Sequence, residues 1–511
     1  MEATATGRAP QAFEDLVELS REKYGASVLY ATDDFFAEKE NLLRPEKAIF
    51  IDGKYTDRGK WMDGWESRRK RTPGHDFAII RLGLPGVVRG VVVDTAFFKG
   101  NYPQACSIEG VSLPAHASVE ELLREDLAWT ELLPRSDLAG DAENPFEITG
   151  AGAADRVTHL RLHIYPDGGV ARLRVYGDVT PSTRFLGRPG TTQEVDFAAV
   201  ENGAVVLSCN DMFFGSRHNL ISPGRAINMG DGWETKRSRR PGPDWVILKL
   251  AAQANLHRAI VDTLHFKGNF PESCALFGID VKPGEAPPGP DSAWNEILPR
   301  TKLSAHTLHD FEAEVAAVGP VTHVMMRIWP DGGVSRLRLL GEVTEEGATT
   351  VGLRYLNALS LASRTELLRT ACASSRFAAQ LAAEVPFTSF QSLAEKARKV
   401  WFSLTPKDWD EAFAAHPRIG ARKGGAREMK EQAGMSRASE DLRYAMEELN
   451  RDYESKFGRI YLVCASGKTA EELVTIARGR MDNTPEAELK VAAEEQAKIT
   501  ELRLSKIVRN R

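Results

Sequence analysis

The chain of 511 residues is too long for one hydrophobic core, and its length predicts about three domains. Its hydrophobic share of 42%, charged share of 27% and mean hydropathy of -0.32 are typical of a globular protein and exclude a mainly disordered or fibrous chain. The formal net charge of -5 gives no general electrostatic signal for nucleic acid, and no stretch approaches the roughly 20 apolar residues of a membrane helix.

The N-terminal segment lacks the charged start, apolar centre and small-residue cleavage site of a secretory signal. Residues 1–24 are therefore predicted to form a flexible leader, and the expected location of the protein is cytoplasmic. The five cysteines are odd in number, widely spaced and never in a CxxC pair. This pattern argues against a disulfide framework and a structural zinc site, and it favours a reducing compartment.

An internal repeat organises the first two thirds of the chain. Residues 63–106 align without a gap on residues 231–274, and about 20 of the 44 pairs are identical. Both copies contain DGWE, then DTxxFKGNxPxxC, and further on PDGGVxRLR. Such a long match indicates a duplicated module. The sequence therefore predicts two copies, over residues 25–185 and 186–345.

Each copy has the residue pattern of β-structure. Leu160, Leu162 and Ile164 alternate with polar residues, a PDGG turn follows, and a second alternating run begins at Ala171. This pattern predicts a hairpin with one buried face. Short apolar runs between Gly- and Pro-rich turns predict an all-β sandwich of roughly 150 residues per copy.

The pattern changes towards the C-terminus. Residues 346–355 are predicted to be a linker because apolar periodicity is lost, and residues 356–511 are predicted to form an all-α domain. Helix starts are indicated where Thr405 and Thr484 each precede a proline, and where Thr469 and Glu472 form a capping box. Gly458 is a predicted helix stop.

Two loops of each copy carry polar residues suited to a small ligand. In DTxxFKGNxP, a carboxylate, an ammonium and an amide surround a glycine that can turn the chain, which suits a small anionic, urea-like substrate. A structural turn in which the aspartate pairs with the lysine explains the same residues. In DGWE, the tryptophan is predicted to lie in the core, whereas the glutamate suits a ligand, an acid or base, or an ordinary ion pair. The candidates by residue type are Glu66, Arg71, Asp94, Lys99 and Asn101 in the first copy, and Glu234, Arg239, Asp262, Lys267 and Asn269 in the second.

The arginines that follow the PDGG turn are further candidates. Their guanidinium groups suit a bidentate contact with a carboxylate, but a solvated strand face explains them equally well. These residues are Arg172 and Arg174 in the first copy and Arg336 and Arg338 in the second. The copies differ in the DTxxFKGN loop, where Phe97 in the first corresponds to His265 in the second.

The duplicated pattern of DGWExxR, DTxxFKGNxP and PDGGVxRLR resembles the allantoicase family over roughly residues 25–345. The resemblance implies two jelly-roll-like sandwiches, a homo-oligomer, and hydrolysis of allantoate to ureidoglycolate and urea. A divalent metal for this reaction is left open. The alternative is that the two sandwiches are a non-catalytic ligand-binding module.

The helical third has its own candidate pair. His416 precedes a proline in HPRIG, and Glu431 follows fifteen residues later, so that a carboxylate could orient an imidazole and raise its basicity. As bare spacing, this also fits a surface histidine beside an ordinary helical glutamate.

The neighbouring motifs resemble the OHCU decarboxylase family, whose full name is 2-oxo-4-hydroxy-4-carboxy-5-ureidoimidazoline decarboxylase. The motifs LNALS, HPRIG, EQAG and FGxIYLVCASGKT occur in order over roughly residues 356–508. The resemblance implies formation of (S)-allantoin without a cofactor. It also implies catalytic roles for His416, Glu431 and Arg503 and substrate binding by Pro417, Gln432, Val463 and Ala465. Glu428 departs from the serine usual in the family, which motivates the alternative of an inactive oligomerisation domain.

The sequence therefore predicts a multidomain chain of two all-β sandwiches and an all-α domain. The predicted function is a bifunctional hydrolase and carboxy-lyase of purine and ureide breakdown, acting on two small molecules, allantoate and OHCU. Nucleic acid and membranes are not expected partners.

Overall fold

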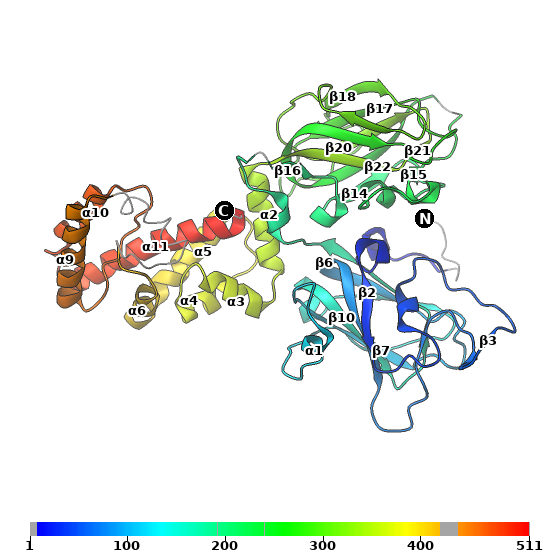
Figure 1. The fold of residues 1–511 in the computed structure, drawn as a ribbon, viewed down its shortest axis with the longest axis horizontal. Helices are drawn as coiled ribbons and strands as arrows, with labels where there is room; N and C mark the ends of the chain where they lie inside the picture. Colours follow the sequence, from blue (N-terminus) through cyan, green and yellow to red (C-terminus); the bar gives the residue numbers. More distant parts are fainter. Residues whose placement is uncertain (1–7, 192, 240, 420–437, 510–511) are drawn as a thin grey trace. The chain divides into compact units, whose positions relative to one another are not determined.

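The structure of the chain is a computed structural model, which describes residues 8–191, 193–239, 241–419 and 438–509 (Figure 1). The chain divides into two compact units, with the boundary between Val351 and Gly352. The first unit contains the two copies of the repeat, each folded as a jelly-roll-like β-sandwich, and the second is helical. The predicted fold class is confirmed.

A long bent strand, β6 (Asp76–Asp94), organises the first sandwich. Its first half pairs with β10 and β2, and its second half pairs with β12 and β9. Because one strand takes part in both sets of pairings, the two layers of the sandwich are continuous through it. The other main strands are β1 (Val17–Glu18), β2 (Ser27–Ala31), β7 (Ala105–Val111), β8 (Thr130–Asp137), β9 (Glu143–Glu147), β10 (Arg156–Tyr165) and β12 (Arg172–Val179), with the short helix α1 (Val119–Leu122).

The second sandwich repeats this topology around β16 (Asp244–Asp262). Its other main strands are β13 (Val195–Asp196), β14 (Val205–Cys209), β17 (Ser273–Ile279), β18 (Asn295–Lys302), β19 (Leu308–Phe311), β20 (Val321–Trp329) and β22 (Arg336–Val343). Trp65 and Trp233, the tryptophans of DGWE, are completely buried, as predicted for core residues.

The predicted hairpin around the PDGG turn is wrong. In the strand order β1-β12-β6-β10-β7-β8, β6 lies between β12 and β10. The turn therefore crosses from the layer of β10 to the layer of β12. Its residues Gly169–Val170 (β11) pair instead with Trp65–Glu66 (β5), an arrangement repeated by β21 (Gly333–Val334) and β15 (Trp233–Glu234). Leu160, Leu162 and Ile164 are buried as the alternation predicts, but His159 and Arg172 of the predicted polar face are buried as well. Residue alternation also does not specify a strand's partner.

The predicted flexible leader is wrong for the described residues after position 7. Phe13 and Leu19 are buried, and β1 pairs with β12. Burial of these apolar side chains and the pairing of β1 with β12 stabilise an ordered conformation of this segment. Residues 13–19 of the predicted leader thus form part of the first sandwich.

The predicted linker over residues 346–355 is also wrong, because helix α2 (Glu345–Ala358) spans it. The hydroxyl of Thr344 accepts a hydrogen bond from the N–H of Gly347, and Val351, Leu353 and Leu356 are buried. A capped first turn and three buried side chains stabilise a helix that the polar run TEEGATT does not reveal.

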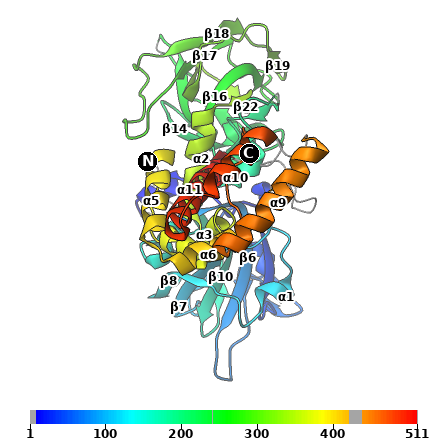
Figure 2. The ribbon, with the colours of Figure 1, turned by 90° about the vertical axis from the view of Figure 1, so that its left-hand side faces the viewer.

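The helical unit contains α3 (Leu361–Arg369), α4 (Ser375–Ala382), α5 (Phe390–Ser403), α6 (Pro406–Ala414), α9 (Glu440–Phe457), α10 (Ala470–Arg480) and α11 (Pro485–Arg509). The predicted starts at Pro406, Thr469 and Pro485 are confirmed, and Gly458 ends α9 with a φ of 69°. The long helix α11 packs against α5, α6 and α9 (Figure 2). Among the described helices, none combines the length and apolar character needed to cross a bilayer.

Two equivalent buried histidines make the stability of the sandwiches depend on pH. His159 on β10 and His323 on β20 are 0% and 6% exposed, and burial lowers the pKa of each to about 4. The nearby charges of Arg81 and Lys249, respectively, also lower these pKa values. In the unfolded chain each of these histidines binds a proton near pH 6.5, whereas in the folded chain it does so only near pH 4. The free energy of unfolding therefore decreases as the pH falls through this window.

We expect the opening free energy of β10 and β20 to fall by up to about 1.4 kcal/mol per pH unit for each histidine below pH 6.5. Hydrogen-exchange mass spectrometry at pH 7 and pH 5 measures this separately for the two strands. The variants His159→Gln and His323→Gln are expected to flatten the pH dependence of their own strand only. An unchanged slope in both variants would contradict the assignment.

Candidate active sites

In each sandwich, the DGWE and FKGN motifs meet through a carboxylate and an amide. Asn101 donates a hydrogen bond from Nδ2 to Oε1 of Glu66 at 2.7 Å, and Asn269 donates in the same way to Glu234. Burial raises the pKa of Glu66, an effect that the hydrogen bond from Asn101 opposes. Four of the predicted candidates are therefore brought together in two equivalent pairs.

A second pair of groups joins DGWE to the arginine after the PDGG turn. Arg172 and Asp63 form an ion pair with 2.9 Å between Nη2 and Oδ2, and Arg336 and Asp231 form one at 2.8 Å. Arg172 and Arg336 are 2% and 3% exposed, so they do not lie on a solvated strand face. The two aspartates were not among the predicted candidates, although both belong to the shared DGWE motif.

The aspartates of the DTxxFKGN loops have different partners, and Asp262 is buried whereas Asp94 is half-buried. Asp94 accepts a hydrogen bond from the N–H of Ala96 at 2.8 Å, and burial raises its pKa. Asp262 accepts from the N–H of Leu264 and forms an ion pair with Arg225, with 3.2 Å between Nε and Oδ2. Sequence reasoning missed Arg225, which lies in a different loop.

The remaining basic candidates are placed differently from these groups. Lys99 forms an ion pair with Asp141 at 3.6 Å, rather than with Asp94 as the structural alternative supposed. Lys267 is exposed in the second copy. Arg71 and Arg239 are exposed in the loops that precede β6 and β16, and the contacts described for the chain do not join them to either cluster. Residue type alone did not identify which cations accompany the carboxylates.

In the helical unit, one cavity brings together three separate segments of the chain. These are the residues after α6, the extended segment before α10, and the middle of α11. The lining residues are His416, Pro417, Ile419, Leu462, Val463, Cys464, Ala465, Ser466, Ile499, Leu502 and Arg503. Five of the predicted site residues are among them. Glu431, Gln432 and Glu428 lie outside the described residues.

The backbone around His416 is anchored on both sides. The N–H of His416 donates to the carbonyl of Phe413 at the end of α6. Further on, Asn450 donates to the carbonyl of Ile419 at 2.9 Å, and Arg418 forms two hydrogen bonds of 2.6 and 2.7 Å with Glu454. These contacts tie the segment to α9 and hold the half-buried imidazole at the cavity wall.

The extended segment is held through Cys464. Its N–H donates to Glu495 at 2.8 Å, and its carbonyl accepts from Lys468 at 2.6 Å. In this extended segment, Val463, Cys464 and Ala465 all line the cavity. Arg503, which is 8% exposed, brings a guanidinium to the same wall from α11.

Among the described residues, no group of three or more His, Cys, Asp or Glu side chains is arranged to hold a metal ion. The groups that meet in the sandwiches are carboxylates paired with amides and with guanidinium groups. In the helical unit, an imidazole and a buried guanidinium line one cavity.

Comparison with known proteins divides the chain in the same way. A family model described as the allantoicase repeat matches residues 17–180 and 195–344, and a model described as OHCU decarboxylase matches residues 357–505. The probable allantoicase of Pseudomonas savastanoi pv. phaseolicola is 47% identical over 334 residues, which cover 65% of this chain and 98% of that protein.

Solved structures give the same two similarities. The crystal structure of allantoicase from Saccharomyces cerevisiae is 35% identical and covers 64% of this chain and 92% of that one, with a TM-score of 0.52. A crystal structure of OHCU decarboxylase in the presence of (S)-allantoin is 37% identical and covers 28% of this chain and 97% of that one, with a TM-score of 0.26.

Proposed function

The chain belongs to the allantoicase family and carries an OHCU decarboxylase domain, and on this premise we propose that it is a bifunctional enzyme of ureide metabolism. The two sandwiches hydrolyse allantoate to ureidoglycolate and urea. The helical unit decarboxylates OHCU to (S)-allantoin. The observation that carries this proposal is that two unlike scaffolds each match an enzyme family over nearly all of their length.

The hydrolysis requires groups that hold a carboxylate, stabilise developing charge and protonate the leaving nitrogen. The loop clusters supply such groups, because each holds a glutamate–asparagine pair, and the loop aspartate Asp262 of the second copy is buried. The family match argues against the alternative of a purely ligand-binding module. A metal requirement is left open.

For the decarboxylation, His416 supplies the proton that replaces CO2, and Arg503 binds a carboxylate or ring oxygen of OHCU. The cavity that contains both residues supports this assignment. Glu431 orients the imidazole, Pro417 and Gln432 line the substrate, and backbone groups of Val463 and Ala465 bind it. The conjugated heterocycle accepts the electron pair left by CO2, so the reaction needs no cofactor.

The two reactions are not consecutive, since allantoin must first be opened to allantoate by another hydrolase. The proposal therefore requires no passage of an intermediate between the units. A cytoplasmic location and a homo-oligomeric state stay predictions.

The purified full chain tests both activities. It is incubated with allantoate while urea is measured, and separately with freshly generated OHCU while the circular dichroism of allantoin is followed. We expect urea in the first assay and an excess of the (S) enantiomer in the second. Failure to release urea would refute the hydrolase, and racemic allantoin would refute the decarboxylase.

A further inference from the structure

The two sandwiches differ in the groups that surround the equivalent aspartates Asp94 and Asp262. Asp262 in the second sandwich is 2% exposed and pairs with Arg225, whose side chain is 58% exposed. The buried carboxylate thus anchors a guanidinium that remains largely open to solvent. In the first sandwich the aligned residue is Lys47, and the ion pairs described for this sandwich do not join it to Asp94.

An imidazole is attached to the loop that carries this guanidinium. His265 adopts a φ of 73°, and its backbone N–H donates a hydrogen bond to Nδ1 of His306 at 2.9 Å. Its ring Nε2 lies 2.9 Å from the carbonyl oxygen of Ala226. Because a carbonyl only accepts, Nε2 carries the proton, and in the neutral ring Nδ1 is left as the proton acceptor. Ala226 follows Arg225 directly, so one loop positions both side chains.

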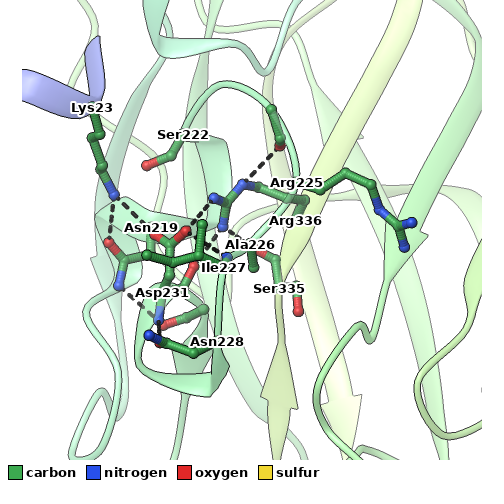
Figure 3. A network of polar contacts seen from close by, with 12 residues as sticks. Lys23, Asn219, Ser222, Arg225, Ala226, Ile227, Asn228, Asp231, Ser335 and Arg336 are labelled. Carbon is green, nitrogen blue, oxygen red and sulfur yellow. Dashed lines mark hydrogen bonds and ion pairs between the residues drawn. The ribbon is translucent and has the colours of Figure 1, made fainter.

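That loop, residues 224–231, is held at both ends. Arg336 donates to the carbonyl of Gly224 at 3.1 Å and pairs with Asp231, while Lys23 of the first sandwich pairs with Asp231 at 3.1 Å (Figure 3). Burial by itself would raise the pKa of Asp231, but Arg336 and Lys23 lower it overall. The Arg225 side chain extends away from this network.

The first sandwich has an aromatic contact at the corresponding place. Phe97, which replaces His265, adopts nearly the same φ of 68°, and Phe50 stacks on it with ring centroids 5.9 Å apart. Phe50 lies in a loop that is ten residues longer than its counterpart in the second sandwich. Lys60 in turn lies over the ring of Phe50, at 4.6 Å from its centroid. The backbone is preserved, but the proton acceptor is replaced by an apolar ring that is 36% exposed.

We infer that the second sandwich alone carries the hydrolytic site, with Arg225 binding the substrate carboxylate and His265 transferring the proton. This inference rests on the proposed hydrolysis of allantoate. The first sandwich is a structural partner that contributes Lys23 as a positioning residue for the loop 224–231.

The imidazole of His265 by itself can carry out both proton transfers of the hydrolysis. Water forms the new C–O bond at the central carbon of allantoate and gives one proton to Nδ1 of His265. The C–N bond to one ureido group breaks, the nitrogen keeps the electron pair, and the imidazolium returns the proton to it. The products are urea and ureidoglycolate, and the imidazole is neutral again.

The duplication supplies a matched control for each variant. His265→Phe installs the residue of the first sandwich and is expected to reduce urea release about 100-fold or more. The reciprocal Phe97→His is expected to stay within about twofold of the parent chain. His265→Gln keeps a donor for the carbonyl of Ala226 but has no titratable Nδ1, and we expect it to be as impaired as His265→Phe. Full activity of His265→Gln would show a merely structural role and overturn the inference.

The role of the Arg225 guanidinium is also tested with a matched variant in the first sandwich. Arg225→Gln is expected to lower kcat/KM for allantoate about 10- to 100-fold, mainly through KM, because a charged hydrogen bond to the carboxylate is lost. Lys47→Gln is expected to leave both constants within about twofold. Equal losses in the two copies would overturn the assignment to one sandwich. An inactive parent chain would instead refute the proposed hydrolysis itself.

Discussion

Replacing His416 with alanine is expected to abolish stereospecific formation of (S)-allantoin while leaving urea release from allantoate intact. His416 and the buried Arg503 line the same cavity in the helical unit, and the candidate hydrolytic groups belong to the other compact unit. Loss of a general acid or base typically reduces a rate about 100- to 10,000-fold.

The measurement follows the circular dichroism of allantoin formed from fresh OHCU, with urea release from allantoate measured on the same preparation. Far-ultraviolet circular dichroism checks that the helices are retained. Arg398→Ala is a useful control, because Arg398 on α5 forms an exposed ion pair with Glu494 on α11 and does not line the cavity. Equal loss of both activities in folded His416→Ala protein would refute the division of labour.

Arg172→Met is expected to destabilise the first sandwich by about 3–5 kcal/mol, because it removes the buried ion-pair partner of Asp63 and leaves this carboxylate only the longer, 3.8 Å contact with the half-exposed Arg44. Arg172 and Asp63 are 2% and 6% exposed, so solvent cannot replace the lost charge. Arg172 also donates to the carbonyls of Glu46 and Asp63, at 2.9 and 3.1 Å, and these contacts are lost as well.

An exposed pair in the same sandwich is the matched control. Arg89 and Asp178 lie 2.7 Å apart, but their side chains are 44% and 49% exposed, so Arg89→Met is expected to lower stability by less than about 1 kcal/mol. Hydrogen exchange of β12 measures both variants. The double variant Asp63→Asn with Arg172→Met is expected to recover part of the loss, and an effect of Arg172→Met no larger than that of Arg89→Met would disprove the buried-charge argument.

The candidate sites were predictable to different extents. The match between the two copies pointed to Glu66 and Asn101, which meet in the structure, and the motifs of the helical third pointed to His416 and Arg503, which line one cavity. Arg71 was chosen by residue type and lies apart from the cluster. Arg225 was missed because its importance depends on Asp262, which lies on a distant strand.

The order of residues along the chain determined what depends on near neighbours: the β pattern of the repeats, the helix starts at Pro406 and Pro485, and the stop at Gly458. Alternation and capping act over a few residues, so a linear pattern records them. Tertiary structure decided which strands pair and which charges meet. The insertion of β6 between β10 and β12, the burial of Arg172 and the reach of Lys23 to Asp231 all depend on packing between distant segments, and residue periodicity carries no information about such partners.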